Sequence, residues 1–510
     1  MSLLGLDVGT TGTKGVAFDL DGKVIASAYR EYPLLSPKPG WQELDPNQVW
    51  AAVREVLGEV ARKTAADPIK AMAISAQGEA AHGVSKDGVC LTNSVVTFDA
   101  RTADFPKWWL ERKSRMDLAQ ISGMPLHGMY TLNKILWFKQ NQPDVYAKVW
   151  KFLCYEDFVH LRLGLEPVMS HSLAARTMAL DVRKGDWSDE LLQIAGVDRS
   201  YLPKTAPSGQ VVGTVPDKIA ADIGLPKGIV VVTGGHDQPA GALGAGILSS
   251  GEAMYATGTV ECICPIFDTY AVTEKTVESN LCCYPSCVPG LYASIAFNFT
   301  GGSLLKWYRD TFGGLEQQEA AKTGRDVYDL LCAGVRPEPE NLLILPHFTV
   351  TGTPHFDTAS RGAILGLTLR TTREDIVGAI LSGVTYEMKL NLELLQSAGV
   401  RVNRLRAVGG GAKSSVWVQR KADIMGVPVS VLETTEAASL GVAMLAGHGA
   451  GIVSDLKEMA KTVVKVRAVY DPEPKRAAAF SELFAAYREV YPAIHRINHA
   501  LASRDSAGSN

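Results

Sequence analysis

The sequence predicts an α/β protein made of two related domains. A strand–loop–strand unit rich in glycine and threonine opens the chain at residues 3–28, and a strand, Gly-Thr turn and strand recur at 252–267. Apolar runs of strand length alternate with helical stretches along much of the chain, which is the pattern of an α/β fold. The repeated unit suggests two related domains that face one shared anion.

Composition bounds the class of protein. The chain has 510 residues, enough for two large domains or roughly three of 150 residues, with 46% hydrophobic and 21% charged residues, as in an ordinary soluble protein. A net charge of −3 gives no electrostatic argument for binding nucleic acid or an anionic membrane. No apolar run reaches the length of a membrane span, and Asp7 interrupts the short apolar start, so we expect no signal peptide and a cytoplasmic protein.

The chain contains eight cysteines, which is too few for a disulfide framework in a protein of this size. Their clustered spacing, C-x-C followed by C-C-x3-C, matches no zinc pattern, so we expect buried, reduced thiols. The clustered cysteines are Cys262, Cys264, Cys282, Cys283 and Cys287.

The opening unit reads as strands at 3–7, 13–19 and 23–28, the last two joined by the turn Asp21-Gly22. The first loop reads Asp-Val-Gly-Thr-Thr-Gly-Thr-Lys over residues 7–14. Glycines and threonine hydroxyls of this kind can surround a phosphate, and Asp7 could hold a hydrated cation. The loop is neither a P-loop nor a dinucleotide fingerprint, so taken alone it could equally be an ordinary hairpin tip.

The rest of the first half continues the alternation. Asp45 and Pro46 predict the start of a helix over 46–63, and a buried strand at 69–76 leads into the loop 77–79. Strands follow at 82–91 and 95–98, residues 102–200 read as mostly helical, and a strand at 229–233 runs into Gly234–Gln238 before a helix at 240–247.

The second half begins with the recurring strands at 252–257 and 260–267. Gly301 and Gly302 precede a helix at 303–312 and so could place amides at a helix N-terminus. A glycine cluster at 409–411 precedes a helix at 414–426, and helices are expected at 436–447 and 472–500, followed by a disordered tail.

Motifs in a fixed order resemble the FGGY carbohydrate kinases, and most of all their xylulokinase branch. The resemblance covers residues 3–495, with one departure, Ser382, at the last position of the second signature. The matching motifs are Asp7-x-Gly9-Thr10, the signature from Met129 to Asn141, the Gly234-Gly235-x-Asp237 strand end, the signature beginning at Gly362, and Gly409 to Ser414.

This resemblance implies two actin-like (ribonuclease H-like) ATPase domains with an interdomain cleft. Residues 1–246 would bind sugar and carry the catalytic base, 247–455 would bind nucleotide, 456–500 would form a C-terminal helical segment, and 501–510 a disordered tail. The implied activity is ATP-dependent phosphorylation of a terminal hydroxyl of a ketose, a pentulose such as D-xylulose first. A kinase of glycerol, erythritol or another polyol or deoxyketose stays open as an alternative activity. A non-catalytic nucleotide switch and a sugar sensor stay open as alternatives of a different class. A homodimer is a possible assembly.

The resemblance also assigns roles. Asp237 would be the base, although a helix-capping aspartate is the alternative on sequence grounds, and Asp7 would hold Mg²⁺, through water. ATP would meet Asp7, Gly9, Thr10, Thr11, Thr13, Lys14, Gly258, Thr259, Gly301, Gly302, Gly410, Gly411 and Ser414. The sugar would meet Gln77, Glu79, Asp99, Arg101, Met129, Asp237 and Gln238.

The expected sugar pocket is mixed in character. Gly78 stands where glycerol kinases carry arginine, and Met129 where they carry tyrosine, so we expect an enlarged site. Thr97 and Phe98 replace a tryptophan and an asparagine of the xylulokinase element around Asp99. His82 and His236 lie near these loops without a second ligand at metal spacing, so structural roles are expected for both.

Overall fold

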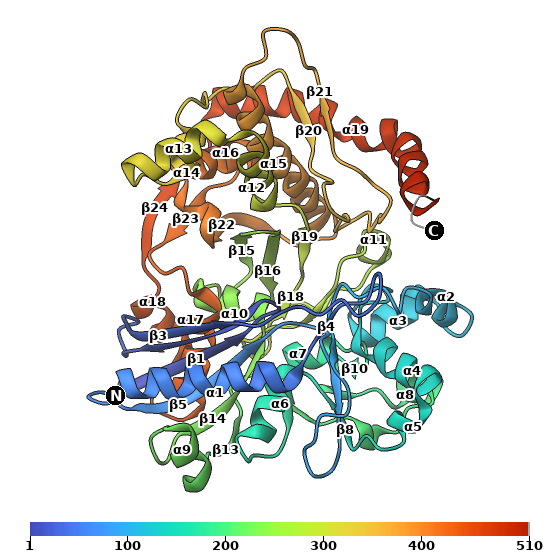
Figure 1. Cartoon of the computed structure of the whole chain (residues 1–510), viewed down its shortest axis with the longest axis vertical. Coiled ribbons are helices and arrows are strands. Elements are labelled where there is room, and N and C mark those ends of the chain that lie inside the picture. Colours follow the sequence, from blue (N-terminus) through green and yellow to red (C-terminus); the bar gives the residue numbers. More distant parts are fainter. Residues whose placement is uncertain (508–510) are drawn as a thin grey trace.

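The computed structural model describes residues 1–507 and has two lobes, each built on one mixed sheet (Figure 1). The first sheet has the order β13-β14-β5-β1-β2-β3. Its strands are β1 (Ser2–Val8), β2 (Gly12–Phe18), β3 (Val24–Glu31), β5 (Ile69–Ala76), β13 (Val211–Thr214) and β14 (Val230–His236).

The second sheet has the order β17-β18-β16-β15-β22-β23-β24, with β19 paired to β16. Its strands are β15 (Gly251–Thr257), β16 (Glu261–Phe267), β17 (Tyr284–Pro285), β18 (Tyr292–Ala293), β19 (Ala296–Asn298), β22 (Val402–Val408), β23 (Val429–Leu432) and β24 (Val466–Tyr470).

The two sheets repeat one topology, as the recurring hairpin predicted. In the first sheet, β1 pairs antiparallel with β2 and parallel with β5, and β5 pairs parallel with β14. In the second sheet, β15 pairs antiparallel with β16 and parallel with β22, and β22 pairs parallel with β23. A long helix precedes the second parallel strand in each lobe, and a small-residue helix follows the third. These helices are α1 (Pro46–Lys63) and α10 (Asp237–Gly244), then α15 (Arg373–Ser397) and α17 (Ala437–Gly449).

Helix α1 shows how the sequence sets the packing. Asp45 caps it by accepting a 2.8 Å hydrogen bond from the Asn47 amide, and Pro46 opens its first turn, both as predicted. Its apolar face, including Val53 and Val56, lies on the first sheet. A Cβ at Gly15 of β2 would lie 2.6 Å from Val56 Cγ1, so only glycine lets the helix approach this closely.

Two helices from the second half of the chain pack on the first lobe. α17 and α18 (Leu456–Val463) lie between β23 and β24 of the second sheet in sequence. α17 nevertheless packs on the first sheet, against β1, β5 and β14, with α18 beside it (Figure 1). The contact is close, because a Cβ at Gly5 would lie 1.8 Å from the Ser439 carbonyl oxygen. The chain then returns through β24 to the edge of the second sheet. The expected helical segment 456–500 is therefore divided between the lobes before α19 (Pro474–Ala507) begins.

Several predicted boundaries change. The helix expected at 240–247 begins at Asp237, with His236 as its N-cap residue. α19 continues to Ala507, so the tail expected to be disordered from 501 is helical to 507; positions 508–510 lie outside the described residues. Asn498 anchors this end of the helix by donating a 2.9 Å hydrogen bond to the Arg361 carbonyl, an anchor that the tail's polar composition does not reveal.

About half of residues 102–200 are helical, fewer than predicted, and short strands lie between the helices. The helices are α2 (Phe105–Leu110), α3 (Arg115–Ser122), α4 (Thr131–Asn141), α5 (Pro143–Tyr146), α6 (Tyr155–Arg162), α7 (His171–Ala175) and α8 (Asp189–Ala195). The strands are β8 (Lys151–Leu153), β9 (Val168–Ser170), β10 (Leu180–Asp181) and β11 (Asp186–Trp187).

Shorter elements complete the fold. The first lobe also has β4 (Glu43–Leu44), β6 (His82–Val84), β7 (Ser94–Val95), β12 (Lys204–Ala206), a 3₁₀ turn at Arg199–Tyr201 and α9 (Asp217–Ile223). The second half adds α11 (Glu274–Glu278), α12 (Gly302–Phe312), α13 (Gly314–Thr323), α14 (Val327–Cys332), β20 (Leu343–Leu345), β21 (Ala363–Leu365), a 3₁₀ turn at Gly410–Lys413 and α16 (Ser415–Met425).

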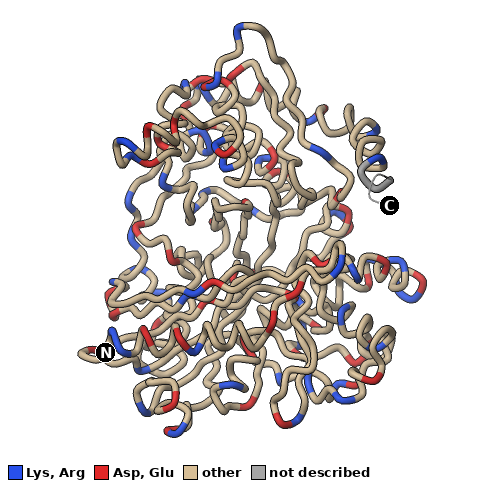
Figure 2. The backbone as a smooth tube through the Cα atoms, in the orientation of Figure 1, with Lys and Arg blue, Asp and Glu red and all other residues tan. Residues whose placement is uncertain are grey.

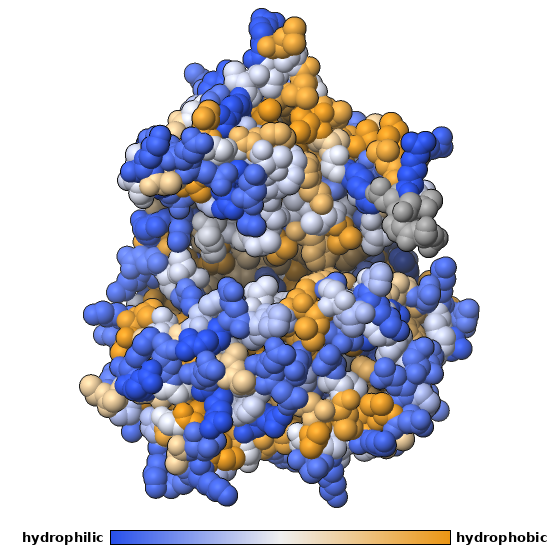
Figure 3. Space-filling model, viewed as in Figure 1, coloured by the Kyte–Doolittle hydropathy of each residue, from blue (hydrophilic) through white to orange (hydrophobic). Residues whose placement is uncertain are grey.

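The surface is hollowed between the two lobes (Figure 3). Basic and acidic residues are interspersed along the backbone of both lobes (Figure 2). None of the described helices combines the length and apolarity needed to cross a membrane. The hollow faces the ends of the strands that carry the predicted site.

Candidate active site

Three parallel strands of the first sheet bring polar side chains together at their C-terminal ends. Asp7 lies near the end of β1, Ser75 lies opposite it on β5, and Asp237 directly follows β14. The Ser75 hydroxyl donates a 2.7 Å hydrogen bond to Asp7 Oδ1. Because carboxyl ends of parallel strands meet at one sheet edge, residues more than 200 positions apart converge here.

Asp237 is positioned as a proton acceptor. Burial, followed by the charges of Asp7 and Glu79, raises its pKa to about 7. His236 Nε2 lies 3.1 Å from its Oδ1. Asp237 is the first residue of α10, and His236, not Asp237, occupies the N-cap position. These observations weigh against the helix-cap alternative.

The surroundings of Asp7 suit a cation. Burial and the nearby charge of Glu436 raise its pKa to about 6, while the Ser75 hydrogen bond and Lys14 partly offset this rise. A raised carboxyl pKa means that the negative charge is under-compensated by the protein's own groups. A divalent cation near Asp7 would supply the missing charge, so the residues fit the predicted metal.

Some polar groups at the tip of the first hairpin already have hydrogen-bond partners within the protein. Thr11 is exposed, whereas the Thr10 hydroxyl donates a 2.9 Å hydrogen bond to Gln77 Oε1. Gln77 Nε2 in turn donates to the Gly9 carbonyl at 2.9 Å. Gln77, predicted to contact sugar, follows β5 directly behind this loop, and both ends of its side-chain amide bond to the loop.

Thr13 also departs from the prediction. It is fully buried, and its hydroxyl donates a 3.0 Å hydrogen bond to the Asp7 carbonyl. Side chains alternate along β2, so Thr13 faces the core while Lys14 faces the cleft. Thr13 therefore stabilises the hairpin and does not face a phosphate.

Lys14 reaches across to the second half of the chain. Its Nζ lies 2.6 Å from Glu436 Oε1, at the start of α17. The two side chains are 35% and 26% exposed, so solvent can compete for both. The sequence analysis did not single out Glu436, since a glutamate before a helix has many ordinary explanations.

The second hairpin presents Gly258 and Thr259 as an exposed tip. The amides of Gly301 and Gly302 were expected to be free for phosphate, but they donate to the Thr259 and Gly258 carbonyls at 2.9 and 2.8 Å. They are engaged because α12 begins directly on the hairpin. A Cβ at Gly302 would lie 2.8 Å from the Gly258 oxygen, so these glycines permit close packing.

The glycine cluster after β22 leaves open space. Gly409 has a left-handed φ of 90° and passes close to the Thr257 carbonyl, whereas a Cβ at Gly410 would meet nothing within 4 Å. Ser414 caps α16 by accepting a 3.3 Å hydrogen bond from the Trp417 amide. A pocket of about 210 Å³ lies behind the cluster, lined in part by Gly409, Lys413, Thr434 and Arg467.

Glu79 is held rigidly beside Asp237. Its φ of 62° is rare for a non-glycine residue, and its carbonyl accepts a 2.8 Å hydrogen bond from the buried Lys134. Thr97 Oγ1 donates to its Oε2 at 2.8 Å, and Arg176 pairs with its Oε1. A strained backbone with a fully bonded carboxylate indicates a preorganised group.

Arg176, at the end of α7, is a residue that sequence reasoning missed. Its guanidinium lies 5.5 Å from the Tyr130 ring and 5.6 Å from the Tyr284 ring, and its Nη2 lies 4.0 Å from Met129 Sδ. Tyr284 comes from β17 in the second half of the chain. No local pattern marks either residue, because only the tertiary fold brings α7 and β17 to this edge.

Gly78 does not enlarge the pocket as expected. A Cβ there would lie 2.9 Å from His236 Nε2 and 3.4 Å from Arg176 Nε, so other elements already fill this space. His236 has a second contact, a 3.0 Å hydrogen bond between its Nδ1 and the Tyr284 hydroxyl. Gln238 follows the base, and no described residue pairs with its buried Oε1.

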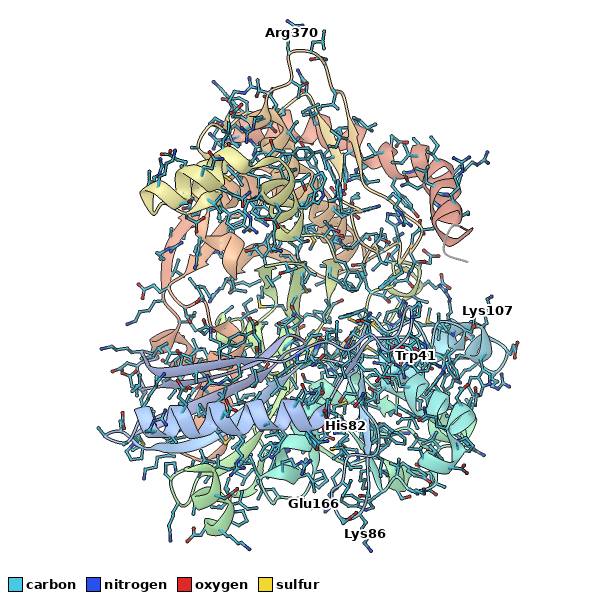
Figure 4. The ribbon with its side chains drawn as sticks, viewed as in Figure 1. Trp41, His82, Lys86, Lys107, Glu166 and Arg370 are labelled. Carbon is cyan, nitrogen blue, oxygen red and sulfur yellow. The ribbon has the colours of Figure 1, made fainter. Side chains whose placement is uncertain are left out.

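Asp99 and Arg101 pair with each other instead of pointing freely into a pocket. Arg101 donates to Asp99 Oδ1 from Nε at 2.8 Å, and to Glu43 Oε1 at 2.6 Å. Its guanidinium lies 3.9 Å from the ring of Trp41, whose place in the first lobe Figure 4 marks. With side chains 0% and 2% exposed, these two residues support the pocket wall, and direct sugar contact is not available to them in this conformation.

His82 is structural, as expected. It lies inside the first lobe (Figure 4), its Nδ1 is 2.9 Å from the Ser94 hydroxyl, and its ring packs edge-on against Phe158. The clustered cysteines are all free and buried, and burial raises their pKa values.

Comparison with known proteins identifies the family. Residues 2–244 match the N-terminal domain of the FGGY family of carbohydrate kinases, and residues 253–450 match its C-terminal domain. The chain belongs to the FGGY family of carbohydrate kinases. It is therefore a sugar kinase with two ribonuclease H-like ATPase lobes, and the alternatives of a non-catalytic switch and a sugar sensor are set aside.

Relatives in this family have different named substrates. The chain is 28% identical to a xylulose kinase of Bacillus subtilis, over 98% of this chain and 99% of the relative. It is also 28% identical to a gluconokinase of the same organism, over 88% of each chain. The crystal structure of a ligand-bound xylulose kinase from Lactobacillus acidophilus superposes with a TM-score of 0.87 at 26% identity, covering 97% of this chain and 98% of that one.

Proposed function

We propose that this kinase transfers the γ-phosphoryl group of ATP to a terminal hydroxyl of a ketopentose, with Asp237 as general base and Mg²⁺ as the metal. The observation that carries the proposal is Asp237 itself, a cleft carboxylate with a pKa near 7 beside Asp7. A base of this pKa is unprotonated for much of the time at neutral pH and still basic enough to accept a hydroxyl proton.

The proposed transfer follows from this arrangement. Asp237 takes the proton of the sugar hydroxyl while the hydroxyl oxygen bonds to the γ-phosphorus. The bond from that phosphorus to the β–γ bridging oxygen breaks, and ADP leaves. Lys14 and the exposed hydroxyls of Thr11 and Thr259 would contact the phosphates, and Thr10 would join them by releasing Gln77. Asp7 would hold Mg²⁺ through water, and the ion would neutralise phosphate charge when bound.

The nucleotide would lie along the second lobe. Gly410 is exposed at the end of β22 with open space around it, and Gly411 and Ser414 continue the same surface. Thr259 lies at the tip of the neighbouring hairpin in the same sheet. This arrangement supports nucleotide binding between the glycine cluster and the two hairpins.

The proposal of a ketopentose rests on the side chains around Asp237 and on the named relatives. Glu79, His236, Gln238 and Arg176 offer polar groups, and Met129 adds an apolar wall. Gln238 Oε1 has no hydrogen-bond partner among the described residues, and a short polyol that does not reach it would leave it unpaired, at a cost of about 1–3 kcal/mol. D-xylulose is the first substrate to test, because relatives that match this chain over nearly its full length are named xylulose kinases.

Gluconate phosphorylation is the second candidate, because the gluconokinase relative is equally identical over a shorter stretch. The pocket gives a physical means of discrimination. Glu79 places a negative charge where a gluconate carboxylate would be repelled, although Arg176 partly balances it.

The test is steady-state kinetics with D-xylulose, D-ribulose, L-xylulose, L-fuculose, D-gluconate, erythritol and glycerol. We expect a ketopentose to exceed glycerol by at least about tenfold in kcat/KM. Gluconate, glycerol or erythritol as the best substrate would overturn the ketopentose assignment while leaving the kinase assignment intact.

A further inference from the structure

A cluster of metal-ligating side chains lies outside the proposed active site, on the second lobe. Asp357 comes from the segment between β20 and β21, and His495 and His499 come from the C-terminal half of α19. His499 Nε2 lies 2.9 Å from Asp357 Oδ2, and His495 Nε2 lies 3.9 Å from the same oxygen. One ligand atom from each residue lies within 4.8 Å of the others.

The arrangement follows from helical spacing. Residues four apart lie on the same face of a helix, so His495 and His499 present adjacent imidazoles, with ring centroids 4.0 Å apart. The segment after β20 descends past α19 towards α11 (Figure 1), where Asn280 donates a 2.9 Å hydrogen bond to the Pro354 carbonyl. The facing segment thus brings its carboxylate to the two histidines.

We propose that Asp357, His495 and His499 bind a Zn²⁺-type divalent cation. Two imidazole nitrogens and one carboxylate oxygen are ligands that zinc prefers, whereas Mg²⁺ prefers oxygen alone. Around tetrahedral zinc, ligand atoms are separated by roughly 3.4 Å, given bonds of about 2.0–2.2 Å. The separations of 2.9 and 3.9 Å lie on either side of this value, so small side-chain rotations would complete the site.

Neighbouring groups already orient the carboxylate. The Tyr491 hydroxyl donates a 3.0 Å hydrogen bond to Asp357 Oδ2, and the His355 ring stacks on Tyr491 with centroids 4.0 Å apart. Groups of this kind behind a ligand fix its direction and strengthen metal binding. The three ligands are 11%, 42% and 44% exposed, so an ion can enter from solvent without disturbing the core.

The alternative is a simple hydrogen-bonded contact that docks α19 onto the facing segment. Such a contact needs only Tyr491, His499 and Asp357. His495 distinguishes the two explanations, because 3.9 Å is too long for a hydrogen bond to Asp357 but suitable for two ligands of one ion. The metal site therefore requires His495, and the docking contact does not.

The site adjoins a contact between the lobes. Phe356, next to Asp357, has a left-handed φ of 48°, and its ring lies 5.1 Å from His127 of the first lobe. His127 Nδ1 in turn accepts a 3.1 Å hydrogen bond from the Met129 amide. A bound ion would fix the segment that carries this contact, and it would add stability that the metal-free chain lacks.

The test uses the full chain without an affinity tag and without nucleotide, titrated with Zn²⁺ by calorimetry and with Co²⁺ by visible absorption. We expect one ion per chain, a tetrahedral Co²⁺ spectrum and a raised melting temperature with Zn²⁺. His495→Ala and His499→Ala should each weaken binding by at least about tenfold. His448→Ala is the matched control, since the side chain of this exposed histidine bonds only to the Val453 carbonyl among the described residues.

Both ligand histidines are more than two-fifths exposed, so their alanine variants should fold, which circular dichroism and unchanged Mg-ATP kinase activity would verify. Asp357→Asn provides an independent variant with the same expected loss of binding. Wild-type protein that fails to bind Zn²⁺ up to about 100 μM, or His495→Ala that binds as tightly as wild type, would overturn the proposal.

Discussion

Replacing Asp237 by asparagine separates the chemical role of this carboxylate from its electrostatic effect on stability. Asparagine keeps the shape but cannot accept the sugar proton. Loss of general-base catalysis should lower kcat by about 10²–10⁴, with nucleotide affinity nearly unchanged, because the carboxylate is proposed to face the sugar. The same substitution should stabilise the protein at alkaline pH.

The magnitude of that stabilisation follows from the pKa shift. A rise from 3.8 to about 7 corresponds to roughly 4 kcal/mol of destabilisation once the folded carboxylate is ionised, at about 1.36 kcal/mol per unit. The side chain is 32% exposed and asparagine is itself polar, so we expect only roughly 1–2 kcal/mol to be recovered.

The sign of the pH dependence is fixed by linkage. The folded state binds this proton more tightly than the unfolded state does, so the carboxylate lowers stability progressively as pH rises from about 4 to about 7. The gain in Asp237→Asn should therefore be larger at pH 8 than at pH 5. Above the folded pKa of about 7 the gain should level off.

The assay is urea unfolding followed by tryptophan fluorescence at both pH values, alongside steady-state kinetics. Asp268→Asn, an exposed aspartate just beyond β16, is the control that should change neither activity nor stability. A variant that keeps more than about half of the wild-type kcat would refute the base assignment. An equal stability difference at pH 5 and pH 8 would refute the electrostatic argument.

Further predictions concern pH, phosphate contact and domain motion. The value of kcat/KM should fall as pH drops below about 7, because protonated Asp237 cannot accept a proton, and a flat profile from pH 5.5 to 8 would contradict this. Thr259→Val should weaken ATP, measured by its KM, by about 1–3 kcal/mol without changing the KM for sugar. Glu436→Gln removes the ion pair with Lys14, and urea unfolding should show a loss of stability of only roughly 0.2–1 kcal/mol at this exposure; a larger loss would contradict the assignment of a solvent-exposed pair. Sugar plus a non-hydrolysable nucleotide should compact the wild type; confirmed binding without compaction would count against closure.

The duplicated fold could be predicted because its signals are local. Each hairpin carries strand alternation and a glycine turn within one short stretch, and Asp7 and Asp237 sit at strand ends where a functional side chain is expected. The packing of α17 on the first sheet could not be predicted, because α17 is apolar nearly all round and its sequence does not indicate which sheet it covers.

The contacts of the individual predicted side chains were harder to predict than their positions in the fold. Gln77 and Thr13 are polar residues in the right loops, yet the fold uses them to brace the hairpin. Asp99 and Arg101 neutralise each other two positions apart. Arg176 carries no motif, since its partner Glu79 is 97 residues away and only tertiary structure joins them.

The packing of α17 on the first sheet has a consequence for expressing the two halves of this protein as separate fragments. Its crossing with α10 leaves no room for side chains, since a Cβ at Gly244 would lie 1.8 Å from the Ala437 carbonyl oxygen and one at Gly441 would lie 2.0 Å from that of Ala240. A fragment ending at residue 246 would expose the apolar sheet face that Leu440 and neighbouring residues cover. The two halves are thus not free-standing modules: expressed separately, each would depend on the other to fold, as the pieces of a split reporter do.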